Sequence, residues 1–540
     1  MTQNSFLSNA AQLSAITRST NGALKYSTTG NSFVDQFGAL SSYTRPRTMS
    51  DIYSDMSVLF SQNKEYAVKF AFYIRMITRV VTYPNGQKSS TVQRGAGLKH
   101  EAIVRFMWLA ENHPDIFWAN VHLIPAIGSW KDLFKMLEMD AMYDGVLDGV
   151  TFNIDWNKLG DFILAGLANP NTSELVKKYL PTIKPKSACA TREAHAKNKV
   201  GKFLARKIFG NKPYEQYRKL KSSGTAHSWQ QLISKGFMSQ IDFSSVHGKA
   251  LAAMSSGKFI INNKLENKFT EWLSKQDTVK FVGYPHELFS KVDQITKSYQ
   301  SVTLNKQFET LVKVAKENAV DNTSMIVVRD TSGSMLSAAN GTSMSCFNIA
   351  KALALFFSYM LDKGAFANSW IEFNRQAKLH TWMGSTPYEK WANDKSQVIG
   401  NTNFASVFKL FAEIKQRNVP ESDFPNGIIC ISDGEFDATT LNQTNVENAK
   451  MILRSAGFSE EFVSNFKIVL WNLQGSSWTK YETYTTAENT FYFSGYDAST
   501  MAFLTGVKDV DGNVKATPKT DVELFEAAMD QEVLNQIAVQ

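Results

Sequence analysis

A cluster of oxygen-bearing side chains follows the first strongly apolar run of the C-terminal third. Asp330, Ser332 and Ser334 form a D-x-S-x-S motif directly after residues 324–329, so that one carboxylate and two hydroxyls share a tight loop that contains a glycine. Hard oxygen ligands with few carboxylates suit Mg²⁺ or Mn²⁺, which favour octahedral sites that retain a water or a partner's oxygen. The motif therefore predicts part of a site for a hard cation.

Two further segments carry oxygens that could complete this site. Thr402 lies before a helical pattern, and Asp433 directly follows the apolar run 427–432. In a parallel sheet covered by helices, ligands bind beyond the carboxyl ends of the strands. We therefore predict one Mg²⁺ or Mn²⁺ held by Asp330, Ser332, Ser334, Thr402 and Asp433. The alternative for a lone D-x-S-x-S motif is a helix or turn cap.

The patterning after residue 321 predicts the elements that would position these residues. Short β-rich runs alternate with helical ones, which is typical of a doubly wound α/β (Rossmann-like) domain over residues 321–540. The expected strands are 324–329, 370–373, 427–432, 466–472 and 489–493, and the expected helices are 346–361, 404–416, 445–456 and 521–537.

The preceding part of the chain has a different pattern. Residues 51–320 repeat apolar residues every three or four positions, and short connections join the helical runs. We predict an α-helical solenoid of HEAT-like pairs that can close into a ring, and the alternative is an irregular helical domain. Residues 1–50 are rich in Ser, Thr, Asn and Gly and predict a loosely ordered N-terminal arm.

Positive charge is concentrated between Lys177 and Lys221. Fourteen Lys or Arg residues and two acids give this segment a net charge of +12, whereas the whole chain carries +8. RNA is bound by Lys and Arg on its phosphates and by aromatic rings on its bases, and this segment interleaves Tyr179, Phe203, Phe209, Tyr214 and Tyr217 before Trp229. We predict RNA contacts at Lys184, Lys186, Arg192, Lys197, Lys199, Lys202, Arg206, Lys207, Lys212, Arg218, Lys219 and Lys221. The alternative is a solvated helix face whose aromatic residues belong to the core.

The oxygen motif resembles the metal-ion-dependent adhesion site (MIDAS) of von Willebrand factor A domains, in which an acidic group of the ligand completes the coordination of the ion. Helical repeats followed by such a domain resemble the TROVE architecture of Ro ribonucleoproteins. Local strings at 93–97, 128–133, 217–220, 401–404, 432–437 and 469–473 are similar to an uncharacterised TROVE-like branch. Ro proteins close their repeats into a ring that binds misfolded and small structured RNAs, so the resemblance implies a similar role here.

Together these features predict a non-enzymatic RNA-binding scaffold with a Mg²⁺-dependent ligand site for an acidic protein partner. The alternative is a metal-dependent interaction or structural component of a larger assembly, viral ones included, that does not bind RNA. Catalytic classes fit poorly, since a haloacid-dehalogenase-type phosphatase needs Asp where Ser332 stands, and a G-x-x-x-x-G-K-[ST] phosphate loop is absent.

Composition adds an expectation about location. No apolar run approaches the roughly 20 residues that a membrane span needs. Residues 1–18 lack the pattern of a secretory signal peptide, and three scattered cysteines (Cys189, Cys346 and Cys430) fit a reducing interior. We therefore expect a cytoplasmic protein, or a component of a virion, without a membrane partner.

Overall fold

The computed structural model divides the chain into two compact units. The sheet unit comprises Met1–Arg45, Ser255–Gly257 and Lys275–Ala528, and the helical unit comprises Pro46–Met254, Lys258–Ser274 and Met529–Gln540. The structure describes residues 5–539 except 45–46, 212, 225–227, 247, 318, 320–323, 340, 440–442, 475–480, 485–486, 507–512 and 514–515. The division differs from the expected boundaries at residues 50 and 320, because residues 1–45 and 275–320 group with the sheet and residues 529–540 group with the helical unit.

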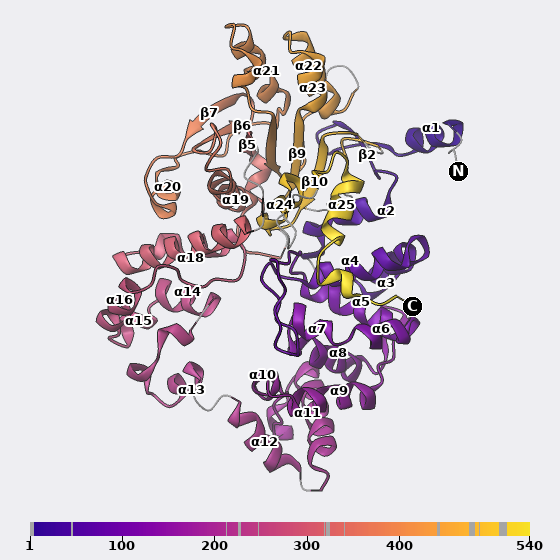
Figure 1. Cartoon of the computed structure of the whole chain (residues 1–540), viewed down its shortest axis with the longest axis vertical. Helices are drawn as coiled ribbons and strands as arrows, with labels where there is room; N and C mark the ends of the chain where they lie inside the picture. The colour runs from indigo at the N-terminus through magenta and orange to yellow at the C-terminus, as the bar shows by residue number, and fades with distance from the viewer. Residues whose placement is uncertain are drawn as a thin grey trace. The chain divides into compact units, whose positions relative to one another are not determined.

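Helices dominate the chain between residues 46 and 274 (Figure 1). Polar side chains cap the first turns of several of these helices. For example, Ser129 and Asp132 form a capping box at the start of one helix, and Thr191 accepts a hydrogen bond from the Ala194 amide at the start of another. The helices are α3 (Met49–Gln62), α4 (Lys64–Arg75), α5 (Lys99–Asn112), α6 (Pro114–Asn120), α7 (Leu123–Ile127), α8 (Trp130–Tyr143), α9 (Trp156–Ala168), α10 (Ser173–Tyr179), α11 (Arg192–Phe209), α12 (Pro213–Ser223), α13 (Trp229–Ser234), α14 (Lys249–Ser256), α15 (Phe259–Asn262) and α16 (Glu266–Ser274).

The sheet unit contains a six-stranded sheet in the order β10-β9-β8-β5-β6-β7. Five strands are parallel, and β7 pairs antiparallel with β6 at one edge. The strands are β5 (Met325–Asp330), β6 (Ser369–Phe373), β7 (Ala377–Thr381), β8 (Gly427–Ser432), β9 (Lys467–Asn472) and β10 (Thr490–Ser494). The five predicted strands agree with β5, β6, β8, β9 and β10 to within one residue, whereas β7 was not predicted.

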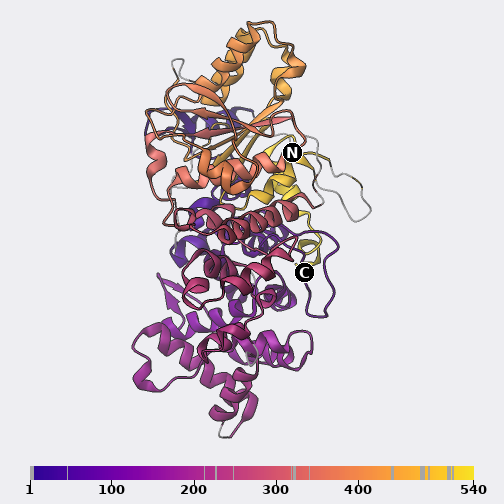
Figure 2. The same cartoon turned by 90° about the vertical axis from the view of Figure 1, so that its left-hand side faces the viewer.

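Helices cover both faces of this sheet (Figure 1, and Figure 2 in the view turned by 90°). Successive strand residues point to opposite faces. Ile326, Val328 and Cys430 therefore share one core with α21 (Ala405–Lys415) and α22 (Asn445–Ser455). On the other face, α19 (Cys346–Met360) packs against β5, β6 and β8, and its Phe357 ring lies 5.1 Å from Trp471. The predicted doubly wound arrangement is therefore observed.

The N-terminal residues carry defined elements, where we expected a loosely ordered arm. The elements are α1 (Ser5–Ser14), β1 (Ile16–Arg18), β2 (Leu24–Tyr26) and α2 (Ser32–Gly38). In α2, Phe33 and Phe37 are buried, and both contact Phe525 of α25 (Asp521–Met529). The polar composition did not predict these elements, because their few apolar residues are buried by segments that are distant in sequence.

A short antiparallel pair, β3 (Val146–Leu147) and β4 (Val150–Thr151), lies in the helical unit, and the sheet unit has five further α-helices. They are α17 (Pro285–Phe289), α18 (Ser298–Lys316), α20 (Pro387–Asn393), α23 (Glu460–Asn465) and α24 (Ala502–Thr505). Across the described ranges, every helix is too short or too polar to cross a membrane. Cys189, Cys346 and Cys430 are buried free thiols.

Candidate metal centre and nucleic-acid interface

The D-x-S-x-S loop begins at the carboxyl end of β5. The Asp330 carboxylate accepts a hydrogen bond from the Ser332 amide (2.8 Å) with one oxygen and from the Ser432 hydroxyl (2.5 Å) with the other. A 3-10 turn over Gly333–Leu336 then brings the Ser332 and Ser334 hydroxyls to 3.1 Å from each other. The loop thus gathers one carboxylate and two hydroxyls beside the end of β8.

Backbone contacts bring Thr402 and Asp433 to the same place. The Gly333 amide donates to the Gly400 carbonyl (3.3 Å), which joins the Thr402 segment to the D-x-S-x-S loop. The Asp437 amide donates to the Thr402 carbonyl (3.0 Å), which joins it to the loop after β8. The Ser334 hydroxyl hydrogen-bonds to the Asp433 carboxylate. The three segments that carry the five predicted ligands are therefore joined at the carboxyl ends of β5 and β8.

The two carboxylates of this cluster are buried, and the positive charge of Lys25 acts on Asp433 without forming an ion pair with it. Asp330 is 0% exposed and Asp433 is 8% exposed. Among the described residues, neither forms a salt bridge. Burial, together with the charge of Asp433, raises the pKa of Asp330 to about 7. Burial also raises the pKa of Asp433. Two such groups are costly to bury unless a proton or a cation neutralises them.

The donor set fits a hard cation. Two carboxylates and three hydroxyls are oxygen ligands of the kind that Mg²⁺ and Mn²⁺ take. Within the described ranges, no three His, Cys, Asp or Glu side chains are grouped so that they could hold a metal ion. A zinc-type cluster is therefore absent from the described residues. A site that has only two carboxylates and relies on hydroxyls is compatible with this finding.

Sequence reasoning missed one member of this cluster. Ser432 is 2% exposed, and its hydroxyl both donates to Asp330 and accepts a hydrogen bond from the Gly434 amide (3.0 Å). Ser432 therefore orients the Asp330 carboxylate from the neighbouring strand. Its position next to Asp433 at the end of a predicted strand was the available signal.

The basic segment forms an exposed charged face on α11. Because an α-helix turns once in 3.6 residues, five polar side chains of α11 lie within about 80° of one another around the axis. These are Arg192, His195, Lys199, Lys202 and Arg206, of which Lys202 is half-buried and the others are exposed. The opposite side of the helix is buried through Val200, Leu204 and Ala205. We call these five residues the basic face.

Acidic neighbours neutralise this face only weakly. Lys199 lies 3.4 Å from Asp144, but both side chains are more than half exposed. Solvent-exposed pairs of this kind contribute little. Neither Lys202 nor Arg206 forms a salt bridge with a described residue. The half-buried Trp156 ring lies beside the face, 5.1 Å from Phe203 and 6.0 Å from the Lys199 ammonium.

Several predicted RNA contacts lie elsewhere. Lys197 pairs with Glu193 (3.0 Å) and Lys219 with Glu215 (3.0 Å). Lys184 and Arg218 are exposed but do not belong to α11. Two lysines have internal partners. Lys207 pairs with Asp161 (2.8 Å), and Lys221 donates to the Leu180 carbonyl, with its pKa lowered by burial. Lys212 and the side chain of Lys186 lie outside the described residues.

None of the six aromatic residues predicted to stack on RNA is fully exposed. Tyr217 is 0% exposed and its hydroxyl donates to the Pro181 carbonyl (3.0 Å), so Tyr217 belongs to the core. Tyr179, Phe203, Phe209, Tyr214 and Trp229 are half-buried. Trp156 was not predicted as a site residue, because it lies outside the basic segment and reaches the face only through the packing of α9 on α11.

Comparisons with known proteins match one part of this chain to a family. Residues 324–536 match the model of a domain of unknown function (DUF7788). No curated protein matches the chain. The solved structures that resemble it include the crystal structure of the Deinococcus radiodurans RO (RSR) protein, with 11% identity and a TM-score of 0.32 over 75% of this chain and 87% of that one. A TM-score this low supports no argument about fold or function.

Proposed function

We propose that this chain is a non-enzymatic RNA-binding protein that holds single-stranded RNA along the basic face of α11. The observation that carries the proposal is the alignment of Arg192, Lys199, Lys202 and Arg206 on one exposed helix face. From Arg192 to Arg206 the face extends for about 21 Å, at 1.5 Å per residue. Regularly placed cations over such a length suit the phosphates of an extended strand.

An aromatic ring beside the basic face favours RNA binding over a charged surface that contacts only solvent. Trp156 offers a partly accessible ring next to Lys199, and sequence-tolerant binding of single strands combines cations with aromatic contacts. The proposal includes the finer expectations from the sequence: HEAT-like repeats that can close into a ring, and a Ro-like (TROVE) organisation.

Neutralising the basic face tests this function. The variant Arg192→Gln, Lys199→Gln, Lys202→Gln, Arg206→Gln removes four charges from exposed or half-buried positions. Loss of four phosphate contacts should weaken binding of a short fluorescein-labelled single-stranded RNA about 100-fold in fluorescence anisotropy.

A matched control separates this face from net charge. The exposed lysines Lys64, Lys88, Lys258 and Lys264 belong to the same unit, and their replacement by Gln changes the net charge equally. The control should bind like wild type. Equal weakening of both variants would contradict a specific role for α11.

A second function is favoured by the unpaired buried carboxylates. We propose that Asp330, Ser332, Ser334, Thr402 and Asp433 hold Mg²⁺ or Mn²⁺ in a von Willebrand A-like domain. When bound, the ion would supply an electrophilic position for a carboxylate of an acidic protein partner. This function alone would make the chain an interaction component of a larger assembly. The outcome of the RNA experiment separates the two roles.

A further inference from the structure

The β1–β2 hairpin grips the loop that follows β8. The Thr20 amide donates to the Glu435 carboxylate (2.9 Å), and the Asn21 side-chain amide donates to the Glu435 carbonyl (2.7 Å). The Ser19 hydroxyl donates to the Phe436 carbonyl (3.3 Å), and Gly22 forms an antiparallel bridge with Asp437. Residues more than 400 positions away thus hold the segment that begins at Asp433.

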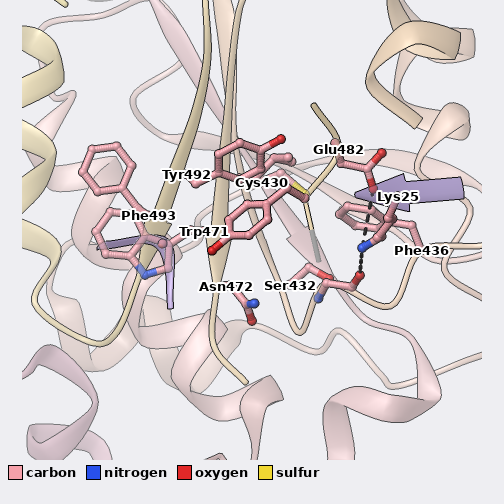
Figure 3. Close-up of a pocket in the computed structure, with 13 residues that line it drawn as sticks. Lys25, Cys430, Ser432, Phe436, Trp471, Asn472, Glu482, Tyr492 and Phe493 are labelled. Carbon is pink, nitrogen blue, oxygen red and sulfur yellow. Dashed lines mark hydrogen bonds and ion pairs between the residues drawn. The ribbon is translucent and has the colours of Figure 1, made fainter. Parts of the chain in front are cut away.

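Of the contacts between the hairpin and this loop, that of Lys25 lies next to Asp433 in the sequence. Its ammonium donates to the Gly434 carbonyl and lies 5.1 Å from the centre of the Phe436 ring (Figure 3). The lysine side chain is only 5% exposed, so its position is set by the protein and not by solvent. Gly434 directly follows Asp433, and its positive φ of 83° is a backbone conformation that favours glycine.

Glu482 holds Lys25 in this position. Its carboxylate lies 3.5 Å from the lysine ammonium, is 2% exposed, and accepts a hydrogen bond from the Asn445 amide (2.8 Å). Both residues line a cavity of about 40 Å³ together with Ser432, Cys430 and Trp471 (Figure 3). Tyr26 and Tyr481 exchange backbone hydrogen bonds (2.7 and 2.8 Å), which aligns Lys25 with Glu482. The lysine therefore has one defined geometry.

We propose that Lys25 is a positioning residue of the metal centre, and that the β1–β2 hairpin clamps the 433–437 loop so that Asp433 faces the Asp330 loop. This inference rests on the proposed metal site. Groups behind the ligands of a metal commonly orient them, and their loss costs about 10- to 100-fold in metal affinity. The N-terminal residues are accordingly part of the site, although none of them would be a ligand.

The test compares wild type with two variants. Lys25→Met with Glu482→Gln removes the contact to Gly434 together with the ion pair, so that neither buried charge is left unpaired. Lys25→Arg keeps a cation beside Glu482 and the Gly434 carbonyl. In calorimetric titration with Mn²⁺, we expect the double variant to bind at least about tenfold more weakly than wild type. Lys25→Arg should keep most of the affinity. Equal Mn²⁺ affinity in all three proteins would overturn the inference.

A second readout does not need the metal. In metal-free protein, amide hydrogen exchange across residues 433–437 should be about tenfold faster in the double variant than in wild type or Lys25→Arg. If wild type binds no Mn²⁺ but this difference appears, the metal site fails while the clamp stands. Unchanged exchange would refute the clamp. Should the double variant not fold, Asn21→Ala, at an exposed position, removes one clamp contact and should show the same changes in smaller measure; wild-type behaviour in Asn21→Ala would then refute the clamp.

Discussion

At the scale of single residues, the unusual feature is a pair of buried carboxylates whose neighbours are hydroxyls. Ser332, Ser334 and Ser432 contact Asp330 or Asp433, yet none of these hydroxyls can neutralise a negative charge. A bound cation between Asp330 and Asp433 would supply the positive charge that these hydroxyls cannot.

Removal of one carboxylate should abolish the effect of the ion on stability. An ion at 100 times its Kd stabilises the folded state by about 2.7 kcal/mol. Mg²⁺ should therefore raise the melting temperature of wild type by several degrees and leave that of Asp330→Ala unchanged in a thermal melt. If Mg²⁺ raises the melting temperature of Asp330→Ala as much as that of wild type, the five residues are not a metal site.

The predicted metal ligands could be named from the sequence because oxygen-bearing residues stand directly after predicted strands. Asp330, Ser332 and Ser334 are adjacent in the chain, and the ends of two parallel strands predict where Thr402 and Asp433 meet them. Lys25 and Glu482 gave no such signal. Their pairing depends on how the first 45 residues pack, which neither spacing nor residue type reveals.

At the scale of elements, β5 is tied to the segment after α20 by a buried ion pair. The Arg329 guanidinium is 0% exposed, lies 2.7 Å from Asp394 and stacks 3.9 Å from the centre of the Trp370 ring. Lys351 of α19 lies 3.6 Å from the same carboxylate, but burial lowers its pKa to about 8 in spite of that neighbour. Arg329 is therefore the main partner of Asp394.

Breaking this pair should destabilise the sheet unit. Asp394→Asn leaves a buried guanidinium without its counter-charge. We expect this to lower the free energy of unfolding by about 3 kcal/mol. Hydrogen exchange of β5 should accelerate accordingly. Asp423→Asn, at an exposed position of the same unit, is the matched control and should leave the exchange unchanged.

The same pair predicts a pH dependence. Burial alone would raise the pKa of Asp394, but the charge and hydrogen bond of Arg329 outweigh burial and lower it to about 2. A pKa below the unfolded value means that the stabilisation is complete above about pH 4 and is lost as the pH falls towards 2. The difference between wild type and Asp394→Asn should shrink by roughly 2 kcal/mol over that range. A constant difference would show that Asp394 has the same pKa in the folded and unfolded states.

Patterning identified the elements whose burial follows a simple period. The parallel strands are apolar on both faces, and their predicted ranges agree with the structure. β7 is an edge strand with mostly exposed or half-buried residues, so it lacked that pattern. The predicted final helix, 521–537, ends at Met529, and only a short 3-10 turn over Leu534–Gln536 follows.

At the scale of the whole molecule, chain order and spatial grouping diverge. The last residues, Met529–Gln540, join the helical unit, where the Gln531 side chain exchanges hydrogen bonds with the Arg94 backbone (2.7 and 2.9 Å). The predicted boundaries assumed contiguous domains. Contacts between residues more than 400 positions apart carry no local signature, so sequence patterning could not reveal them.

In the proposed RNA complex, α11 presents four cations to the phosphates of the strand. The most direct measurement is the salt dependence of RNA affinity for wild type and for the variant that lacks Arg192, Lys199, Lys202 and Arg206. Each phosphate contact with a single strand contributes about 0.7 to the slope of log Kobs against log salt concentration. We expect a slope that is shallower by about 3 in the variant. Equal slopes for the two proteins would contradict this proposal.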